Sequence, residues 1–593
     1  MKTDVMIGSG YTIENPTQGY LKVNQADAQK LHSIKIDPSA RSLGTYVIGS
    51  TGAGKSTLLY NIITQDIRFN EGVCVIDPHG DLIDDVLRGI PDRRKDDVII
   101  FSPGSPEQVS RPIGLNVFDC DRDDPMQKRL VVSTIIGTLY KLFHYSWGPR
   151  MEDLLRVSIL TLLEYPEPVT FLDLQLLLSS ASHRRRYIDA LPENKYVLRQ
   201  FWDVQFDAYD SRQRVEVVGS SLNKIGRFIV DPLIQNIVCQ PENSIDLREV
   251  MDEGKILLVN LSKGEIGEEN ASLLGAVLVN LILIAAMSRR EMPKEERAPY
   301  HLVVDEFQNF ATSSFATLQS EARKYAIDVI VAHQYRDQLD RLSLGATMNV
   351  GNIIALRTTG MDSHHIASTF NTRPPAGKVG FRQFHAVSDK PFPQWNKNLS
   401  KDEISKLDDA LNQVRLATGK ELVWGNSIKR QHDESDDSFF TEVVEYPLLE
   451  AYEEPRRTYA DMQSERANQL STLANYEAIC RLYTPTTEVV MDDEKFLQLW
   501  GEDTEESWAE IEKATKRTYD FTEYKVFLFK MLSSKQTDEG VEQMRNASVL
   551  NFGLPVEDVQ TYIKQRIGGS WDFDMYTTPG FGTSLNADDI VEE

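Results

Sequence analysis

The sequence has 593 residues, of which 41% are hydrophobic, so it has room for several ordinary globular domains. Its 64 Lys and Arg residues and 89 Asp and Glu residues give a net charge of −25, which excludes a protein that coats nucleic acid by bulk electrostatics and confines any DNA contact to a local basic surface. The four cysteines are far apart, which argues against a disulfide framework or a zinc site and for a reducing compartment.

The first predicted strands follow an N-terminal segment, residues 1–40, in which no basic region precedes an apolar block, so we expect no signal peptide. Three short apolar runs lie at Gly44–Gly49, Gly72–Asp77 and Asp97–Phe101. They are rich in β-branched residues, as buried parallel strands are. Residues 41–118 are therefore predicted to form the first part of an α/β domain.

A glycine-rich turn directly follows the first of these runs. The segment GSTGAGKST fits the pattern G-x-x-x-x-G-K-[ST], and a helical run comes after it. The glycines let backbone N–H groups surround a phosphate, Lys55 would reach the β- and γ-phosphates of ATP, and Ser56 would ligate Mg²⁺. The alternative, a chance glycine-rich turn, is disfavoured by the flanking strand and helix. The predicted nucleotide-binding residues are Gly49, Ser50, Thr51, Gly52, Ala53, Gly54, Lys55, Ser56 and Thr57.

The second run ends in the segment VIDPHGDL, which places Asp77 near the same edge of the predicted sheet. Gly80 permits a tight turn here. Asp77 is therefore either part of a turn signal or a nucleotide contact.

A helical region follows, because apolar residues recur at three-to-four spacing between residues 119 and 246. We interpret it as an all-α domain inserted into the α/β domain. Its basic cluster SHRRR, from Ser182 to Arg186, is either a phosphate contact or, more simply, a solvated helix face.

Strand-like runs resume at residues 255–261, 301–306, 327–333 and 352–357, so residues 247–450 are predicted to complete the α/β domain. Alternating strands and helices imply a mainly parallel sheet with helices on both faces. An apolar stretch from Ala271 to Met287 lies between two of these strands. It is near the lower length limit for crossing a membrane, and we expect a core helix there.

Two carboxylates follow the run HLVV in this second block. Asp305 is placed to hold Mg²⁺, directly or through water, and Glu306 is the candidate general base for the attacking water. The alternative is that the pair simply caps the next helix. The presence of a phosphate-binding loop favours the catalytic interpretation, because metal-assisted phosphoryl transfer requires such a carboxylate.

Gln334 and Arg323 lie at opposite ends of the next predicted strand. Ligands bind at the carboxyl ends of parallel strands, so Gln334 is expected at the nucleotide, where its amide can position the attacking water. A strand of about six residues spans roughly 20 Å, so the Arg323 side chain cannot reach the phosphates of its own chain. Arg323 either makes a surface ion pair or reaches the nucleotide of a neighbouring subunit.

The last part of the chain is acidic. Residues 451–580 are predicted to form a mostly helical domain, for which DDEKFLQLWGEDTEESWAEIEKATK is the clearest stretch, and residues 581–593 an unfolded acidic tail. This region is a candidate site for a protein partner.

Six motifs together resemble the HerA/FtsK superfamily of ring-shaped motor ATPases, and within it the type IV coupling ATPases of conjugation. They are GTYVIGSTGAGKST, VIDPHGDL, WGPRMEDLLR, LLVNLSKGEIG, HLVVDEFQNF and EARKYAIDVIVAHQY, within residues 40–360. The resemblance implies a RecA-like P-loop fold, a nucleotide-sensing role for Gln334 and action of Arg323 in trans. Arg150 is a further arginine to test. Coupling proteins usually begin with membrane helices, whereas we expect no integral membrane segment here.

The resemblance implies a homo-oligomeric, hexameric enzyme that uses ATP and Mg²⁺ and translocates DNA. Lys263, in the segment SKGEIG, is a speculative pore contact. Three alternatives stay open: a nucleotide-gated assembly scaffold, a defence ATPase acting with a separate effector protein, and a coupling ATPase for protein substrates. Guanine specificity is disfavoured, because the segment LNKIG lacks the aspartate of a guanine-reading motif. We expect a cytoplasmic protein, peripheral to a membrane-bound secretion complex.

Overall fold

The computed structural model describes two compact units of the chain. One unit comprises Met1–Asn371 and Gln463–Glu593, and the other comprises Thr372–Met462. The described residues are 4–12, 32–339, 341–370, 379–387, 429–430, 442–443, 445–453, 458–489, 515–531 and 535–568. In the second unit, two antiparallel pairs are described: β10 (Val379–Val387) with β13 (Glu445–Glu453), and β11 (Lys429–Arg430) with β12 (Glu442–Val443).

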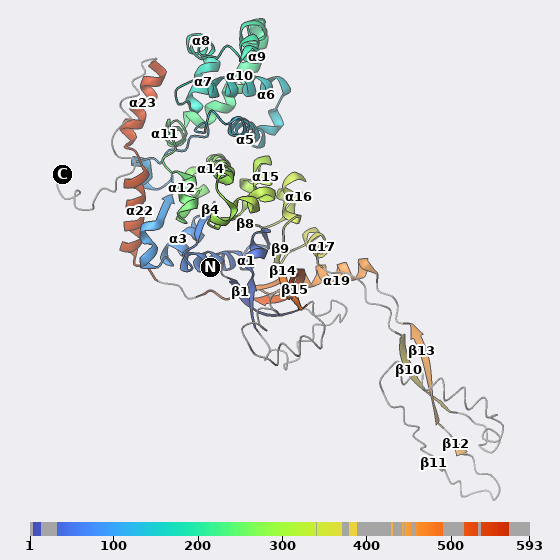
Figure 1. Cartoon of the computed structure of the whole chain (residues 1–593). Coiled ribbons are helices and arrows are strands. Elements are labelled where there is room, and N and C mark those ends of the chain that lie inside the picture. The colour runs from blue at the N-terminus through green and yellow to red at the C-terminus, as the bar shows by residue number, and fades with distance from the viewer. Residues whose placement is uncertain are drawn as a thin grey trace, which may run out of the picture. The chain divides into compact units, whose positions relative to one another are not determined.

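An eleven-stranded sheet is the centre of the first unit, as its described residues show (Figure 1). Seven neighbouring strands are parallel, in the order β9-β3-β8-β7-β4-β6-β5. Almost all of their residues are buried, which explains why they appear in the sequence as continuous apolar runs. The predicted α/β class with a mainly parallel sheet is thus confirmed. The strands are β3 (Thr45–Ile48), β4 (Gly72–Asp77), β5 (Val98–Phe101), β6 (Ile256–Asn260), β7 (Tyr300–Val304), β8 (Ile327–His333) and β9 (Asn352–Ala355).

The register of this sheet brings the predicted site segments to one edge. Ile48 at the end of β3 pairs with His333 at the end of β8, and Val304 at the end of β7 pairs with Ile76 of β4. The residues that follow these strands, including the glycine-rich turn, therefore emerge side by side.

Four antiparallel strands extend the sheet beyond β9, and they come from both ends of the chain. They are β14 (Glu477–Val489), β15 (Thr515–Phe527), β1 (Val5–Thr12) and β2 (His32–Ile36). The prediction of a mostly helical C-terminal region did not include β14 and β15. Their signal is period-two alternation: Ala478, Cys480 and Leu482 enter one core of the sheet, and Ile479 enters the other.

Helices cover both faces of the parallel strands, as predicted. On one face, α2 (Lys55–Arg68) and α3 (Asp81–Arg88) share a core with Val47 and Val75. On the other face, α14 (Glu268–Ser288) is buried along nearly its whole apolar length. Among the described helices, α14 is the one long and apolar enough to cross a membrane, but 89% of its most apolar window is buried inside the protein. Shorter helices complete the domain: α1 (Pro38–Arg41), α4 (Pro106–Ser110), α12 (Leu247–Asp252), α13 (Lys263–Ile266), α15 (Ser313–Glu321), α16 (Arg341–Met348) and α17 (Met361–Ala367).

The segment inserted between β5 and β6 forms a helical layer over α14, with α5 packed directly against it (Figure 1). Its interior and that of the sheet face beneath it form one continuous core. The helices are α5 (Pro125–Phe143), α6 (Pro149–Leu163), α7 (Phe171–Ser179), α8 (Ala181–Asp189), α9 (Tyr196–Gln200), α10 (Ser211–Val230) and α11 (Pro232–Val238).

Two C-terminal helices connect the sheet domain to this helical layer. Helix α22 (Asp538–Phe552) packs against β5, where Ser548 Oγ accepts a hydrogen bond from the Ile100 amide at 3.0 Å. Helix α23 (Val556–Gly568) inserts the buried Arg566, whose Nε lies 2.7 Å from Asp173 Oδ1 in α7. Helix α19 (Tyr459–Ser471) precedes β14. The predicted acidic tail, and most of the stretch DDEKFLQLWGEDTEESWAEIEKATK, lie outside the described residues.

Candidate functional site

The glycine-rich turn between β3 and α2 adopts a conformation that requires its glycines. Gly52 and Gly54 have positive φ angles of 75° and 112°, which side-chain-bearing residues rarely adopt. Helix α2 begins at Lys55, whose Nζ donates to the Gly49 carbonyl oxygen at 2.8 Å. The Lys55 side chain thus crosses the turn, while Ser56 remains exposed at its mouth.

Three buried carboxylates gather beside this turn, at the ends of β7 and β4. Asp305, Glu306 and Asp77 are 5%, 4% and 1% exposed. Burial, followed by the negative charges of Asp77 and Glu306, raises the pKa of Asp305 to about 7, although Lys55 opposes this. The cluster therefore carries more negative charge than Lys55 neutralises, which is the setting that a bound cation would stabilise.

Glu306 has a strained backbone conformation, and three side chains contact its carboxylate. Its φ is 45°, a left-handed value that is rare for glutamate. Its Oε1 accepts from Gln334 Nε2 at 2.9 Å and lies 3.7 Å from Lys55 Nζ, and its Oε2 accepts from Gln308 Nε2 at 2.7 Å. The carboxylate is thereby fixed at the mouth of the turn.

Gln334 connects the two halves of the predicted site. It follows β8, and its Oε1 accepts from Thr51 Oγ1 at 3.0 Å while its amide donates to Glu306. The glycine-rich turn and the carboxylate after β7 thus meet through one glutamine side chain. The structure brings together Thr51, Lys55, Glu306 and Gln334, as the strand-end argument predicts.

Both carboxylate oxygens of Asp77 accept hydrogen bonds from backbone amides of the turn that follows it. Oδ1 accepts from the His79 amide at 2.8 Å and Oδ2 from the Leu82 amide at 3.0 Å, so it fixes the turn that begins α3. Burial raises its pKa. The turn interpretation fits these contacts, and Asp77 also adds negative charge beside Asp305.

The contacts of two tyrosines at this edge were not predicted from the sequence. Tyr46 OH lies 2.5 Å from His333 Nε2, and burial lowers the His333 pKa to about 3, so the imidazole is neutral at pH 7. Tyr476, just before β14, donates its amide to the Ala53 carbonyl oxygen at 2.9 Å. The polar residues that end the run IDVIVAHQY could have indicated that His333 lies at this edge. Tyr476 had no such signal, because it is more than 400 positions along the chain from the turn that it touches.

Arg323 lies at the opposite edge of the sheet, on a 3₁₀ turn, Ala322–Tyr325, that directly precedes β8. Its side chain is exposed and borders a cleft of about 470 Å³. Lys324, not Arg323, pairs with Glu321 at 3.5 Å, and in the described part of the chain Arg323 makes no ion pair. Arg323 is therefore not brought to the other predicted site residues within one chain.

The remaining predicted contacts have partners or stand apart. Lys263 Nζ binds Glu268 Oε1 and Asn309 Oδ1, each at 2.9 Å. In the basic cluster of α8, Arg185 pairs with Asp189 at 2.9 Å, as expected for a solvated helix face. Arg150 is exposed near the start of α6.

The strand order and the glycine-rich turn define an α/β protein with a P-loop-type strand–turn–helix. Searches of family models and of curated proteins found no match to the chain. Among solved structures, it is similar to the bacterial conjugative coupling protein TrwBdeltaN70, with 15% identity and a TM-score of 0.47 over 85% of this chain and 89% of that one. It is also similar to TrwB in complex with ADP and Mg²⁺, with 16% identity and a TM-score of 0.42 over 57% and 76%. VirB4 of Thermoanaerobacter pseudethanolicus matches with 14% identity and a TM-score of 0.36 over 55% and 80%.

Proposed function

We propose that this protein is a Mg²⁺-dependent ATPase of the conjugative coupling type, which assembles into a hexameric ring and translocates DNA. The single observation that carries the proposal is the hydrogen-bonded group at the mouth of the glycine-rich turn. There, Gln334 joins Thr51 to Glu306, and Glu306 lies 3.7 Å from Lys55. A phosphate bound in the turn would face this group directly.

The residues of one chain divide the chemistry of hydrolysis among them. Backbone N–H groups at the start of α2 face the phosphates, whereas those of Gly49 and Ser50 already donate to carbonyl oxygens of the chain. Lys55 leaves the Gly49 carbonyl to contact the β- and γ-phosphates. Glu306 accepts the proton of the attacking water, and Gln334 holds that water in line. The fixed carboxylate of Glu306 needs no reorganisation when charge develops on the transferred phosphate.

The donor set fits Mg²⁺. Ser56 offers an exposed hydroxyl at the start of α2, and Asp305 offers a carboxylate whose pKa is raised to about 7 by burial beside other acids. A hard divalent cation prefers such oxygen ligands and would lower the Asp305 pKa again. When bound, the ion would neutralise charge on the phosphates.

Arg323 completes the site from the next subunit of the ring. It has no ion-pair partner in the described part of its own chain, and it lies at the edge opposite the glycine-rich turn. A head-to-tail ring apposes such opposite edges. The guanidinium then neutralises negative charge that develops on the transferred phosphate.

The test is the rate of ATP hydrolysis with no DNA, with single-stranded DNA and with double-stranded DNA at physiological salt. Strong stimulation by either DNA supports the translocase. Hydrolysis that is indifferent to both excludes DNA-coupled transport, and absence of hydrolysis excludes the ATPase itself.

A second candidate is a nucleotide-gated assembly scaffold, which the net charge of −25 favours, since that sign opposes general DNA binding. In this case ATP would change the assembly state without sustained turnover. Light scattering with ATP, measured beside the hydrolysis assay, separates the two functions.

A further inference from the structure

Tyr476 occupies an unusual position beside the glycine-rich turn. It has a positive φ of 65°, which is unfavourable for a tyrosine, and its main chain is fixed from both sides. Its amide donates to the Ala53 carbonyl at 2.9 Å, and its carbonyl accepts from the Leu528 amide at 2.8 Å. A Cβ placed on Gly54 would lie 3.0 Å from Tyr476 Cδ1, so the ring lies against the turn itself.

The surroundings leave this ring accessible. Tyr476 is 50% exposed although it touches a buried part of the turn, and Phe529, just after β15, is 43% exposed. Asn61 of α2 fixes the segment that carries Phe529, by donating to its carbonyl at 2.7 Å and accepting from the Met531 amide at 2.9 Å. Strand β14 is antiparallel to β9, so Tyr476 is at the nucleotide edge of the sheet.

We propose that Tyr476 stacks on the base of the nucleotide whose phosphates are held by the glycine-rich turn. This inference rests on the proposed function and gives the residue that precedes β14 a part in substrate binding. An aromatic face binds any purine by stacking, and its ring carries the interaction whether or not a hydroxyl is present.

The test compares two probes, Mg-ADP and inorganic tripolyphosphate, by isothermal titration calorimetry. Tyr476→Ala should raise the Kd for Mg-ADP about tenfold and leave the Kd for tripolyphosphate unchanged, because tripolyphosphate has no base. Tyr476→Phe should bind both probes as the wild type does. Tyr196→Ala removes another exposed ring, from the helical insertion, and serves as the control; Tyr196 is 70% exposed and Tyr476 50%.

An equal loss of both ligands would mean that Tyr476 only shapes the turn, and no loss of either would mean that it does not touch the base. Both results overturn the stacking. Failure of the wild type to bind either probe would instead overturn the proposed function.

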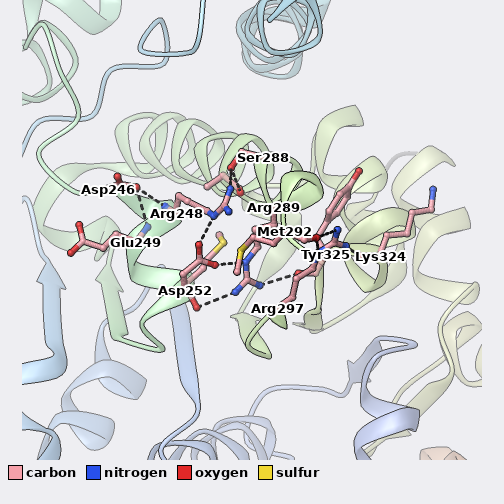
Figure 2. Close-up of polar contacts among 12 residues, drawn as sticks. Asp246, Arg248, Glu249, Asp252, Ser288, Arg289, Met292, Arg297, Lys324 and Tyr325 are labelled. Atoms are coloured by element: carbon pink, nitrogen blue, oxygen red, sulfur yellow. Dashed lines mark hydrogen bonds and ion pairs between the residues drawn. The ribbon is translucent and has the colours of Figure 1, made fainter. Parts of the chain in front are cut away.

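An independent feature lies at the opposite edge, beneath the turn that carries Arg323. Two arginines, Arg289 and Arg297, donate hydrogen bonds to backbone carbonyls of this turn (Figure 2). Arg289, which is fully buried, donates from Nη1 to the Tyr325 carbonyl at 2.9 Å. Arg297 donates from Nη1 to the Lys324 carbonyl and from Nη2 to the Met292 carbonyl, the latter at 2.7 Å.

Both guanidinium groups are themselves held in place. Arg289 Nε donates to Asp252 Oδ1 at 2.8 Å, and Asp252 Oδ2 accepts from Arg248 Nε at 2.5 Å (Figure 2). Arg297 lies over the Tyr325 ring, 5.9 Å from its centroid. A planar guanidinium with several donors can bind carbonyls from separate segments at once, which a lysine cannot reproduce.

We infer that Arg297 and Arg289 are positioning residues that fix the turn so that Arg323 reaches the neighbouring subunit's phosphates. Arg323 itself is exposed. Ala326, which directly follows the turn, has a positive φ of 58°. Because this conformation is unfavourable for alanine, contacts from outside the turn must stabilise it. This inference rests on the proposed action of Arg323 in trans.

The variant to test is Arg297→Ala, because Arg297 is only partly buried and its loss is less disruptive than that of Arg289. The kcat for ATP hydrolysis should fall about 10²-fold through misplacement of Arg323, with the KM for ATP unchanged. Arg290→Ala, which removes an ion pair with Asp124 but no contact to the turn, should keep the wild-type kcat.

Mixing subunits distinguishes positioning from general damage. Arg297→Ala subunits retain their own glycine-rich turn, and Lys55→Ala subunits retain Arg323, so mixed rings should recover activity that neither variant has alone. Absence of recovery, or a normal kcat for Arg297→Ala when Arg323→Ala is inactive, overturns the positioning role. A normal kcat for Arg323→Ala itself would instead overturn the action in trans.

Discussion

The two edges of the parallel sheet differ in how they are built. At the nucleotide edge, Lys55, Glu306 and Gln334 contact one another within a single chain, on residues that directly follow strands. At the opposite edge, Arg323 extends from a short turn, and its support comes from Arg289 and Arg297, which lie on a separate part of the chain. The first edge brings its predicted site residues together within one chain, whereas the second acts only in an assembly if Arg323 works in trans as proposed.

This difference has a physical reason. A phosphate site needs inward-facing N–H groups and fixed carboxylates, which a strand–turn–helix provides locally. A residue that acts on a neighbour must be exposed before assembly and yet keep its position. Supporting the turn through its backbone carbonyls, with Arg289 fully buried and Arg297 partly buried, leaves the Arg323 side chain exposed and meets both conditions.

The largest expected effect comes from removing the acting residue of the opposite edge. Arg323→Ala should lower kcat by about 10³–10⁵-fold while ATP still binds, because developing charge on the phosphate is no longer neutralised. Steady-state hydrolysis and an ATP-binding titration measure the two quantities. Lys324→Ala, the neighbouring exposed cation of the same turn, is the matched control. Equal losses in both variants would indicate a general charge effect.

Glu306→Gln should lower kcat by about 10²–10⁴-fold, because the amide cannot accept the proton of the attacking water. ATP should remain bound, and DNA binding should be retained. In contrast to Arg323→Ala, mixing this variant with Lys55→Ala subunits should restore nothing, because both defects lie in the same half of the site. Unchanged hydrolysis by Glu306→Gln would refute the assignment of the base.

Gln334→Ala should have a smaller effect, about 10²-fold on kcat, since it frees Glu306 and the attacking water without removing either. Because Gln334 also bridges to Thr51, the KM for ATP is a second readout. Gln338→Ala, four residues further along, is the control. A normal kcat for Gln334→Ala would show that Glu306 is positioned by Lys55 and Gln308 alone.

Much of the fold could be predicted from the sequence, because buried parallel strands are continuous apolar runs and amphipathic helices repeat every three to four residues. The strands β14 and β15 were missed because apolar and polar residues alternate along them, instead of forming a continuous apolar run. They lie at an antiparallel extension of the sheet, and their pairing with β9 and β1 joins segments far apart in the sequence. Local patterns do not encode such pairing.

The candidate site divides in the same way. The residues of the glycine-rich turn, Asp305, Glu306 and Gln334 follow from strand ends that meet at one edge. Tyr476, Arg289 and Arg297 could not be found, because each acts through a contact to a backbone carbonyl or a glycine more than 20 positions away in the chain. A backbone acceptor leaves no trace in the residue types.

The smallest expected effect concerns stability and contrasts one histidine from each edge. His301, at the amino end of β7, lies 2.6 Å from Glu71 Oε2 and 2.8 Å from Asp328 Oδ2. Burial and Arg41 oppose its charge, but Asp66, Asp328 and Glu71 outweigh them and raise its pKa to about 9. His333, at the carboxyl end of β8, has a pKa lowered to about 3 and stays neutral above pH 7.

Because the folded-state pKa of His301 lies above its unfolded value, its stabilisation is fully present below about pH 6.5 and is lost as the pH rises through about 9. The free energy of unfolding should therefore fall on the order of 2–3 kcal/mol between pH 7 and pH 9.5. Thermal unfolding of His301→Gln should be lower at pH 7 and should lose this slope, whereas His333→Gln should keep it. A slope that survives in His301→Gln would place the titrating group elsewhere and would show that the charged network at this edge does not set its stability.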